Sequence, residues 1–288
     1  MIKMKVKLID YTREPLKVLA QVTLVSYWDE WSIDKLEEIT EKDAEMHLPR
    51  ILNYGHESIL EHVVLTFAVE DVSVVTLKQI TRHRLMSFTV RSQRYIFEEA
   101  GGKEEVFHAN NLDGQPRRIK VSNDPLELFV IPKSLTEIDS EIIETPDGDY
   151  ILEVYDSNEG LREEVEEFFR QSYALYRKLI KRGIPPEDAR FVLPQAVKTK
   201  FTVTMNFREF KHFIGLRLCE RAQWEIRELA RKMWEEVYKV DELRPILKWA
   251  KVGPRCIQLG YCPERELMPD GCWKRQREWW EEVWGDEE

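Results

Sequence analysis

The chain contains the run Arg82-His83-Arg84-Leu85-Met86-Ser87-Phe88-Thr89-Val90-Arg91-Ser92-Gln93-Arg94-Tyr95. Four arginines, a histidine and two serines fall within this one stretch. Each guanidinium offers a planar fork of N–H donors that matches phosphate and carboxylate groups. The run therefore predicts a binding site for an anion, and we interpret the rest of the sequence as what supports and completes that site.

The chain as a whole carries the opposite charge. Its 288 residues include 43 Lys and Arg against 53 Asp and Glu, a formal net charge of -10. General nucleic-acid and anionic-membrane binders need excess positive charge, so both classes are disfavoured. An RNA-binding module built on the arginine cluster would also need interleaved aromatic residues for base stacking. No membrane span or signal-peptide core is evident, so we expect a cytoplasmic protein that binds no nucleic acid and no membrane.

The sequence before the run predicts the elements that support it. An apolar, β-branched stretch at 63–69 indicates a buried strand, and 73–84 indicates a helix whose last turn carries Arg82, His83 and Arg84. Ser32 is a candidate N-cap, and Gly55 is typical of a helix end. Three further elements are predicted, a strand at 1–9 and helices at 15–26 and 35–52.

The sequence after the run predicts first a small β-type insertion and then a return to regular helices and a strand. Turns and short β-type runs at 128–131 and 150–155, with hairpin-turn chemistry at 146–149, indicate a small β insertion at about 100–158 within a single domain at 1–288. Four regular elements are expected beyond it: a helix at 161–182, a strand at 200–205, a helix at 207–221 capped by Asn206, and a helix at 222–250 interrupted near Pro245.

A Cys- and Trp-rich tail occupies about 251–288. Cys256, Cys262 and Cys272 are spaced C-x5-C-x9-C, and no C-x-x-C pair occurs. Metal sites usually show a tighter spacing, so we predict no metal in the functional site. Free thiols, a disulfide and a bound metal all remain open for the tail.

With these parts in place, the sequence resembles the flavin-dependent thymidylate synthases. Their hallmark is R-H-R, seven residues, then S-x-R, which Arg82-His83-Arg84, Ser92 and Arg94 match without a gap. Singly, these residues could be surface ion-pair partners or structural histidines. Four stretches agree in order, however. The other three are Gly55-His56-Glu57-Ser58 with Glu61-His62, Ala189-Arg190-Phe191-Val192-Leu193-Pro194, and Asn206-Phe207-Arg208 with His212, Leu216-Arg217 and Ala222.

The resemblance implies an enzyme that converts dUMP and methylenetetrahydrofolate to dTMP and tetrahydrofolate, using FAD that NADPH reduces. It implies catalytic roles for Arg217, Ser92 and His56, with Thr23 a weaker candidate for the flavin pocket. The implied FAD contacts are Ser58, Glu61, Arg82, His83, Arg84, Asn206, Arg208, His212 and Arg221. The implied dUMP contacts are Gln79, Arg82, Val90, Arg91, Ser92, Gln93, Arg94, Arg190 and Arg217.

The implied roles agree with the chemistry of these side chains. A nucleotide and a pyrophosphate together need several converging arginines, and a cation near N3 of the uracil stabilises charge on the ring during attack at C5. Thr89-Val90 departs from the polar residues that many members carry there, and Arg221 stands where histidine is frequent. A nucleotide-binding flavoprotein without synthase activity is therefore the alternative.

The pattern and the resemblance together predict an α+β fold, with a central, mostly antiparallel sheet, flanking long helices and the small β-type insertion. On an ideal helix Arg208 and Arg217 point in nearly opposite directions. We therefore expect this helix to serve two active sites, which requires a homo-oligomer. The homotetramer with sites at subunit interfaces that the resemblance implies fits this expectation.

Overall fold

The computed structural model describes residues 4–92, 102–107, 117–122, 124–135, 160–264 and 271–285. The chain divides into two compact units. The first unit contains the described parts of Glu70–Lys78 and Val90–Phe201, and the second contains those of Met4–Val69, Gln79–Thr89 and Thr202–Glu288. Among the described residues, no helix is both long and apolar enough to cross a membrane.

The main sheet has four antiparallel strands in the order β1-β2-β6-β3. Its central strands β2 and β6 alternate between buried and more exposed side chains, as the period-two geometry of a strand requires. In the second unit Leu65, Phe67 and Val203 are buried, whereas Thr66 and Thr204 bond to each other at 3.0 Å on the opposite face. The strand bounds are β1 Lys5–Tyr11, β2 Val64–Ser73, β3 Ser87–Val90 and β6 Lys198–Asn206.

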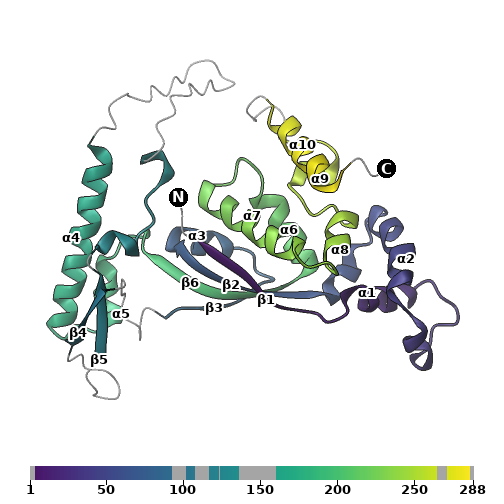
Figure 1. Ribbon diagram of the computed structural model, residues 1–288, viewed down its shortest axis with the longest axis horizontal. Helices are drawn as coiled ribbons and strands as arrows, with labels where there is room; N and C mark the ends of the chain where they lie inside the picture. The colour runs from purple at the N-terminus through teal and green to yellow at the C-terminus, as the bar shows by residue number, and fades with distance from the viewer. Residues whose placement is uncertain are drawn as a thin grey trace. The chain divides into compact units, whose positions relative to one another are not determined.

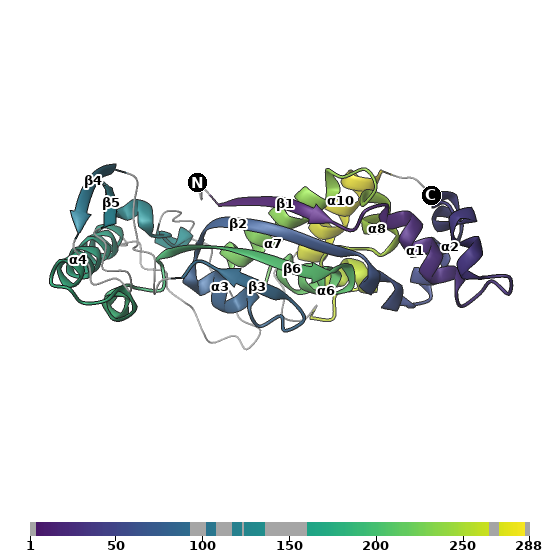
Figure 2. The same ribbon diagram turned by 90° about the horizontal axis from the view of Figure 1, so that it is seen from below.

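Helices cover the apolar face of the sheet in the second unit. Figures 1 and 2 show α6 (Phe207–Arg217) and α7 (Trp224–Tyr238) over β1 and the adjoining part of β2. The Phe67 ring stacks on Phe210 at 5.8 Å between centroids, and Phe213 is fully buried. Burial of each such side chain contributes about 1.5–3 kcal/mol, so this layer fixes the place of α6.

The remaining described elements of this unit are helices. Glu57–His62 forms the 3-10 helix η2, which contacts α6. The others are α1 Pro15–Leu24, η1 Ile33–Glu38, α2 Glu41–Asn53, α8 Arg244–Trp249, α9 Arg255–Leu259 and α10 Cys272–Trp284.

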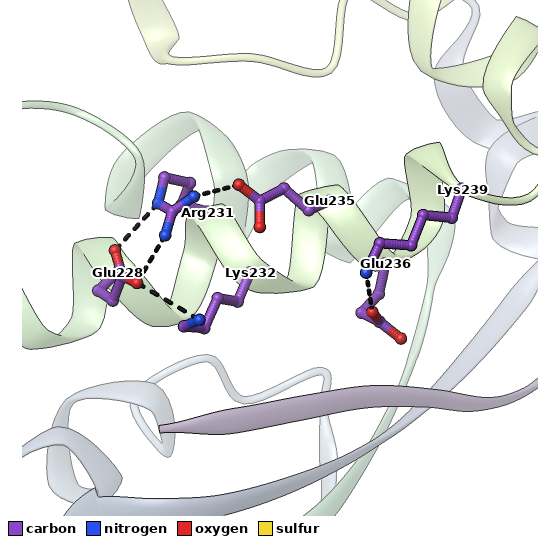
Figure 3. A network of polar contacts seen from close by, with 6 residues as sticks. All are labelled: Glu228, Arg231, Lys232, Glu235, Glu236 and Lys239. Carbon is purple, nitrogen blue, oxygen red and sulfur yellow. Dashed lines mark hydrogen bonds and ion pairs between the residues drawn. The ribbon is translucent and has the colours of Figure 1, made fainter. Parts of the chain in front are cut away.

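A ladder of ion pairs links neighbouring turns of α7 (Figure 3). Arg231 bonds to Glu228 and Glu235, Lys232 lies 3.6 Å from Glu228, and Lys239 pairs with Glu236. Pairs at i,i+3 and i,i+4 on a solvated helix contribute only a few tenths of a kcal/mol each. The pairs of Arg231 complete the exposed face of α7, whereas the buried Glu236 also accepts from the N–H of Leu8 on β1 at 3.1 Å.

The first unit has its own apolar cluster. The described part contains a β-hairpin and a long helix, and Phe129 stacks on Phe169 of that helix at 4.7 Å between centroids. Strand β4 pairs antiparallel with β5, with Gly102 opposite Ser122. The bounds are β4 Gly102–Phe107, β5 Arg117–Ser122, η3 Pro125–Leu128, η4 Lys133–Leu135, α4 Leu161–Lys181, α5 Pro186–Ala189 and η5 Arg190–Val192.

The α+β architecture and most elements are confirmed, and two expected helices are shorter. The expected helix at 35–52 is divided, because Ile39 is extended and buried while a capping box between Thr40 and Asp43 starts α2 anew. The helix expected at 73–84 is α3, Val74–Ile80, so the prediction that Arg82, His83 and Arg84 lie in its last turn is wrong. The chain leaves the helix there and turns His83 inward.

Three downstream expectations also change. The helix expected at 207–221 ends at Arg217, and Gln223 caps α7 by accepting from the N–H of Glu225 and of Ile226. The helix expected at 222–250 breaks after Tyr238, before Pro245, which lies in the first turn of α8. Of the run at 128–131, only Phe129 makes a β-bridge, because Leu128 ends η3. The expected β features at 146–155 lie outside the described residues.

Candidate functional site

The turn between α3 and β3 presents the central motif. It closes through hydrogen bonds from the N–H of Arg82 to Gln79 O at 3.3 Å and from the N–H of His83 to Ile80 O at 3.0 Å. Arg82 and Arg84 are exposed on either side of His83, which is only 5% exposed. The turn thus offers two cations to solvent and buries the histidine between them.

The buried His83 ring joins the two ends of α6. Arg217 Nε donates to His83 Nε2 at 3.1 Å, and His83 Nδ1 lies 3.3 Å from Glu209 Oε1. The ring packs edge-on against Phe213 at 5.1 Å and lies 5.7 Å from the ring of the exposed His212. Burial first, and then the charges of Arg217 and His212, lower the pKa of His83 to about 4. The imidazole is therefore neutral at neutral pH.

The first and last turns of α6 place the partners of His83. Asn206 accepts from the N–H of Glu209 at 2.9 Å, which confirms it as the N-cap and orders the turn that carries Glu209. Burial raises the pKa of the Glu209 carboxyl, although the nearby His212 opposes this. Arg217, the last residue of α6, is half-buried, and desolvation lowers its pKa.

A second polar group lies where η2 meets the start of α6. Exposed Arg208 pairs with Glu61, and buried Lys211 pairs with Glu57. His56 and Ser58 are exposed at the start of η2. Arg208 and Arg217 are nine residues apart, which corresponds to about 13 Å along a helix axis. The structure therefore separates Arg208 with Glu61 from Arg217 with His83.

The other candidate residues are distributed more widely. Gln79 Nε2 donates to Gln223 Oε1 at 3.5 Å, and the exposed Arg221 lies 2.9 Å from Glu264. Thr23 is 1% exposed on α1 and so offers almost no surface to a ligand. Val90, Arg91, Ser92 and Arg190 belong to the first unit, and Gln93 and Arg94 lie outside the described residues.

Sequence reasoning missed several polar neighbours of the candidate residues. Glu209 lies 3.3 Å from His83, Gln223 accepts from Gln79, and Lys211 pairs with Glu57. For Glu209 a signal existed, because it stands three residues after a capping Asn and next to Arg208, but that position equally suits an ordinary helix start. Its partner His83 could be identified only from the tertiary structure.

The cysteines give no sign of a nucleophile. All four thiols are free, and no group of three His, Cys, Asp or Glu side chains within the described ranges could hold a metal ion. Burial raises the pKa of Cys256 to about 11 and that of Cys272 to about 12. Both are therefore thiols at neutral pH, whereas nucleophilic attack needs the thiolate.

The residues around His83 suit an anionic, aromatic ligand. Exposed Arg82, Arg84 and His212 and half-buried Arg217 supply N–H donors around one buried ring. Within the described residues, Arg217 makes no hydrogen bond or ion pair except the one to His83, so its terminal nitrogens remain for a ligand. The donor set fits a flavin dinucleotide and a nucleotide monophosphate, whose phosphates need several guanidinium partners.

Comparison with known proteins gives a consistent result. Residues 7–241 match the family model described as thymidylate synthase complementing protein. The chain is 50% identical over 279 residues to the flavin-dependent thymidylate synthase of Thermococcus onnurineus, covering 97% of each chain. It is 51% identical over 276 residues to the enzyme of that name from Pyrococcus abyssi, covering 96% of each chain. The Geobacter sulfurreducens enzyme is 36% identical over 262 residues, 91% of each chain.

Proposed function

Because the chain belongs to the flavin-dependent thymidylate synthases, we propose that it converts dUMP to dTMP with methylenetetrahydrofolate as carbon donor and FAD, reduced by NADPH, as redox cofactor. The observation that supports the proposal most directly is the burial and hydrogen bonding of Arg217. This guanidinium is fixed at Nε by His83 and is half-buried, with its terminal nitrogens directed to no other described residue.

Arg217 has the chemistry that activation of the pyrimidine needs. A guanidinium beside N3 and the neighbouring carbonyl stabilises negative charge on the uracil ring, and that charge makes C5 a nucleophile towards the one-carbon unit. Partial burial strengthens this effect because the local dielectric is lower than that of water. The neutral His83 supports the role, since it leaves the positive charge on Arg217.

The exposed donors near His83 support FAD binding. Arg82, Arg84 and His212 would bind the flavin dinucleotide, and Arg208 with Glu61 would contact it at the other end of α6. When bound, the flavin supplies the hydride that completes the methyl group. The residues proposed to hold it are Ser58, Glu61, Arg82, His83, Arg84, Asn206, Arg208, His212 and Arg221.

A cysteine-based route has less support. It would require a thiolate near the nucleotide to attack C6, whereas Cys256 and Cys272 remain protonated and buried. Cys219 follows Arg217 by two residues but lies beyond the end of α6.

Ser92 and His56 remain proposed catalytic residues. The proposed dUMP contacts are Gln79, Arg82, Val90, Arg91, Ser92, Gln93, Arg94, Arg190 and Arg217.

The assembly proposed for the enzyme is a homotetramer with active sites at subunit interfaces. It is supported by the opposite placement of Arg208 and Arg217 on α6, which would let one helix contribute to two sites. A cytoplasmic location is proposed because dUMP, folate and NADPH are metabolites of that compartment.

The activity can be tested with the purified protein under anaerobic conditions. We expect a yellow protein that forms dTMP from dUMP, methylenetetrahydrofolate and NADPH, and an Arg217→Ala variant that keeps its flavin but loses at least about a hundredfold in kcat/KM. Flavin reduction by NADPH without dTMP formation would instead support the flavoprotein without synthase activity. A colourless protein that binds no flavin would refute both.

The shared-site arrangement has a separate test. Arg208→Ala and Arg217→Ala chains carrying different affinity tags are co-expressed, and mixed oligomers are isolated by both tags. If one helix serves two sites, mixed oligomers regain part of the activity that each homo-oligomer lacks. Mixed oligomers as inactive as either parent would exclude shared sites.

A further inference from the structure

The polar group behind Arg217 holds a carboxylate that no proposed step uses. The side chains of Glu209 and His83 are buried, with only 6% and 4% of their surface exposed. They lie 3.3 Å apart, and the other nitrogen of the His83 ring accepts from Arg217 at 3.1 Å. His83 therefore contacts the buried carboxyl of Glu209 on one side and the half-buried guanidinium of Arg217 on the other.

The tautomer of the His83 ring is fixed by the hydrogen bond from Arg217. A guanidinium has donors only, so His83 Nε2 must be the unprotonated nitrogen of the ring. The proton of the neutral imidazole then resides on Nδ1, which faces the Glu209 carboxyl oxygen. Burial keeps the ring neutral, with its pKa at about 4. An acceptor at Glu209 thus selects the tautomer that can hold Arg217.

Loss of that acceptor would leave the tautomer of the His83 ring unfixed. With no partner at Nδ1, the proton could move to Nε2, where an N–H would face the N–H of Arg217 and exclude it. Arg217 has no second hydrogen bond to the described residues that could keep it in place. A long, flexible side chain would then have to be ordered by the ligand itself, which weakens binding.

We infer that Glu209 is a positioning residue for the nucleotide: through His83 it sets the orientation of Arg217 and so the affinity of the site for dUMP. The inference rests on the proposed role of Arg217. It adds a buried acid to a site whose candidate ligand contacts are cationic or neutral except Glu61.

A simpler role must be separated from this one. Glu209 occupies the third position of α6, after the cap Asn206, where any acid interacts favourably with the helix dipole. That role needs a negative charge near the helix start, and it does not need the carboxyl to reach His83. Two conservative variants distinguish the roles. Glu209→Asp keeps the charge but is one methylene too short, and Glu209→Gln keeps the length and an acceptor oxygen but has no charge.

The test measures dUMP binding to the flavin-loaded enzyme by calorimetry, together with KM and kcat. We expect Glu209→Asp to bind dUMP roughly tenfold more weakly, the effect of leaving one buried N–H without a nearby acceptor, while Glu209→Gln stays within about threefold of the wild type. The losses should fall on KM for dUMP more than on kcat. In an Arg217→Ala background, Glu209→Asp should change dUMP affinity less than about twofold.

Other outcomes would overturn the inference. An Asp variant that binds dUMP like the wild type beside a weakened Gln variant would assign Glu209 to the helix start. Equal losses in both backgrounds would show that it acts independently of Arg217. If Arg217→Ala itself leaves dUMP binding unchanged, the proposed role of Arg217 fails; if it abolishes binding and Glu209→Asp has no effect, only the positioning role fails.

Discussion

Acidification should destabilise the protein through His83, and the size of the effect follows from its burial. The pKa of this imidazole falls from 6.5 in an exposed chain to about 4 in the folded protein. The unfolded chain therefore takes up this proton at a higher pH than the native state does. The contribution of His83 to the free energy of unfolding is complete above pH 6.5 and declines between pH 6.5 and pH 4. Below pH 4 this contribution is lost. The whole shift corresponds to roughly 3 kcal/mol, of which about 2 kcal/mol is lost by pH 5.

A matched variant isolates this effect from the other titrating groups. His83→Gln removes the titration but keeps an amide that can accept from Arg217 and donate to Glu209, so polar contacts to both neighbours can persist. Glu209 has a raised pKa, which favours the native state as the pH falls, but it is present in both proteins and largely cancels in the comparison.

The measurement is guanidinium-induced unfolding of both proteins at pH 7.5 and pH 5, at one protein concentration. The stability advantage of the wild type over His83→Gln should shrink by about 2 kcal/mol at the lower pH. An advantage that is the same at both values, or larger at pH 5, would refute a neutral, desolvated His83.

Three further outcomes follow from the contacts around α6 and α7. Glu57→Gln should destabilise the protein by about 2–3 kcal/mol in denaturant unfolding, because it leaves the buried Lys211 unpaired, and adding Lys211→Met should restore most of that loss. Arg231→Ala on the exposed face of α7 should cost less than about 1 kcal/mol, and a larger loss would show that the ion-pair ladder is structural. Gly215→Ala should lower the thermal midpoint although Ala favours helix. Its Cβ would lie 2.6 Å from Gln258 Nε2, which donates to Lys211 O at 3.0 Å and to Gly253 O at 2.9 Å.

Several features of the fold could be predicted from local sequence because their causes are local. The apolar, β-branched run at 63–69 located β2, and Asn206 marked the start of α6 through a cap that acts over three residues. Helix ends were harder to place. Helix α3 ends at Ile80 and the chain then turns His83 inward, while α6 ends at Arg217 and Gln223 caps α7 separately.

The site shows the same division between local pattern and tertiary contact. The sequence by itself determined the family, since the R-H-R motif and three further stretches occur in the expected order. It also supplied the cations Arg82, Arg84 and Arg217. Only the tertiary structure decided that His83 turns inward between two exposed arginines, because the direction of a side chain in an irregular turn has no period to follow. It also chose the partners of His83, because Arg217 lies 134 residues further along the chain and is brought to the ring by the burial of α6 on the sheet.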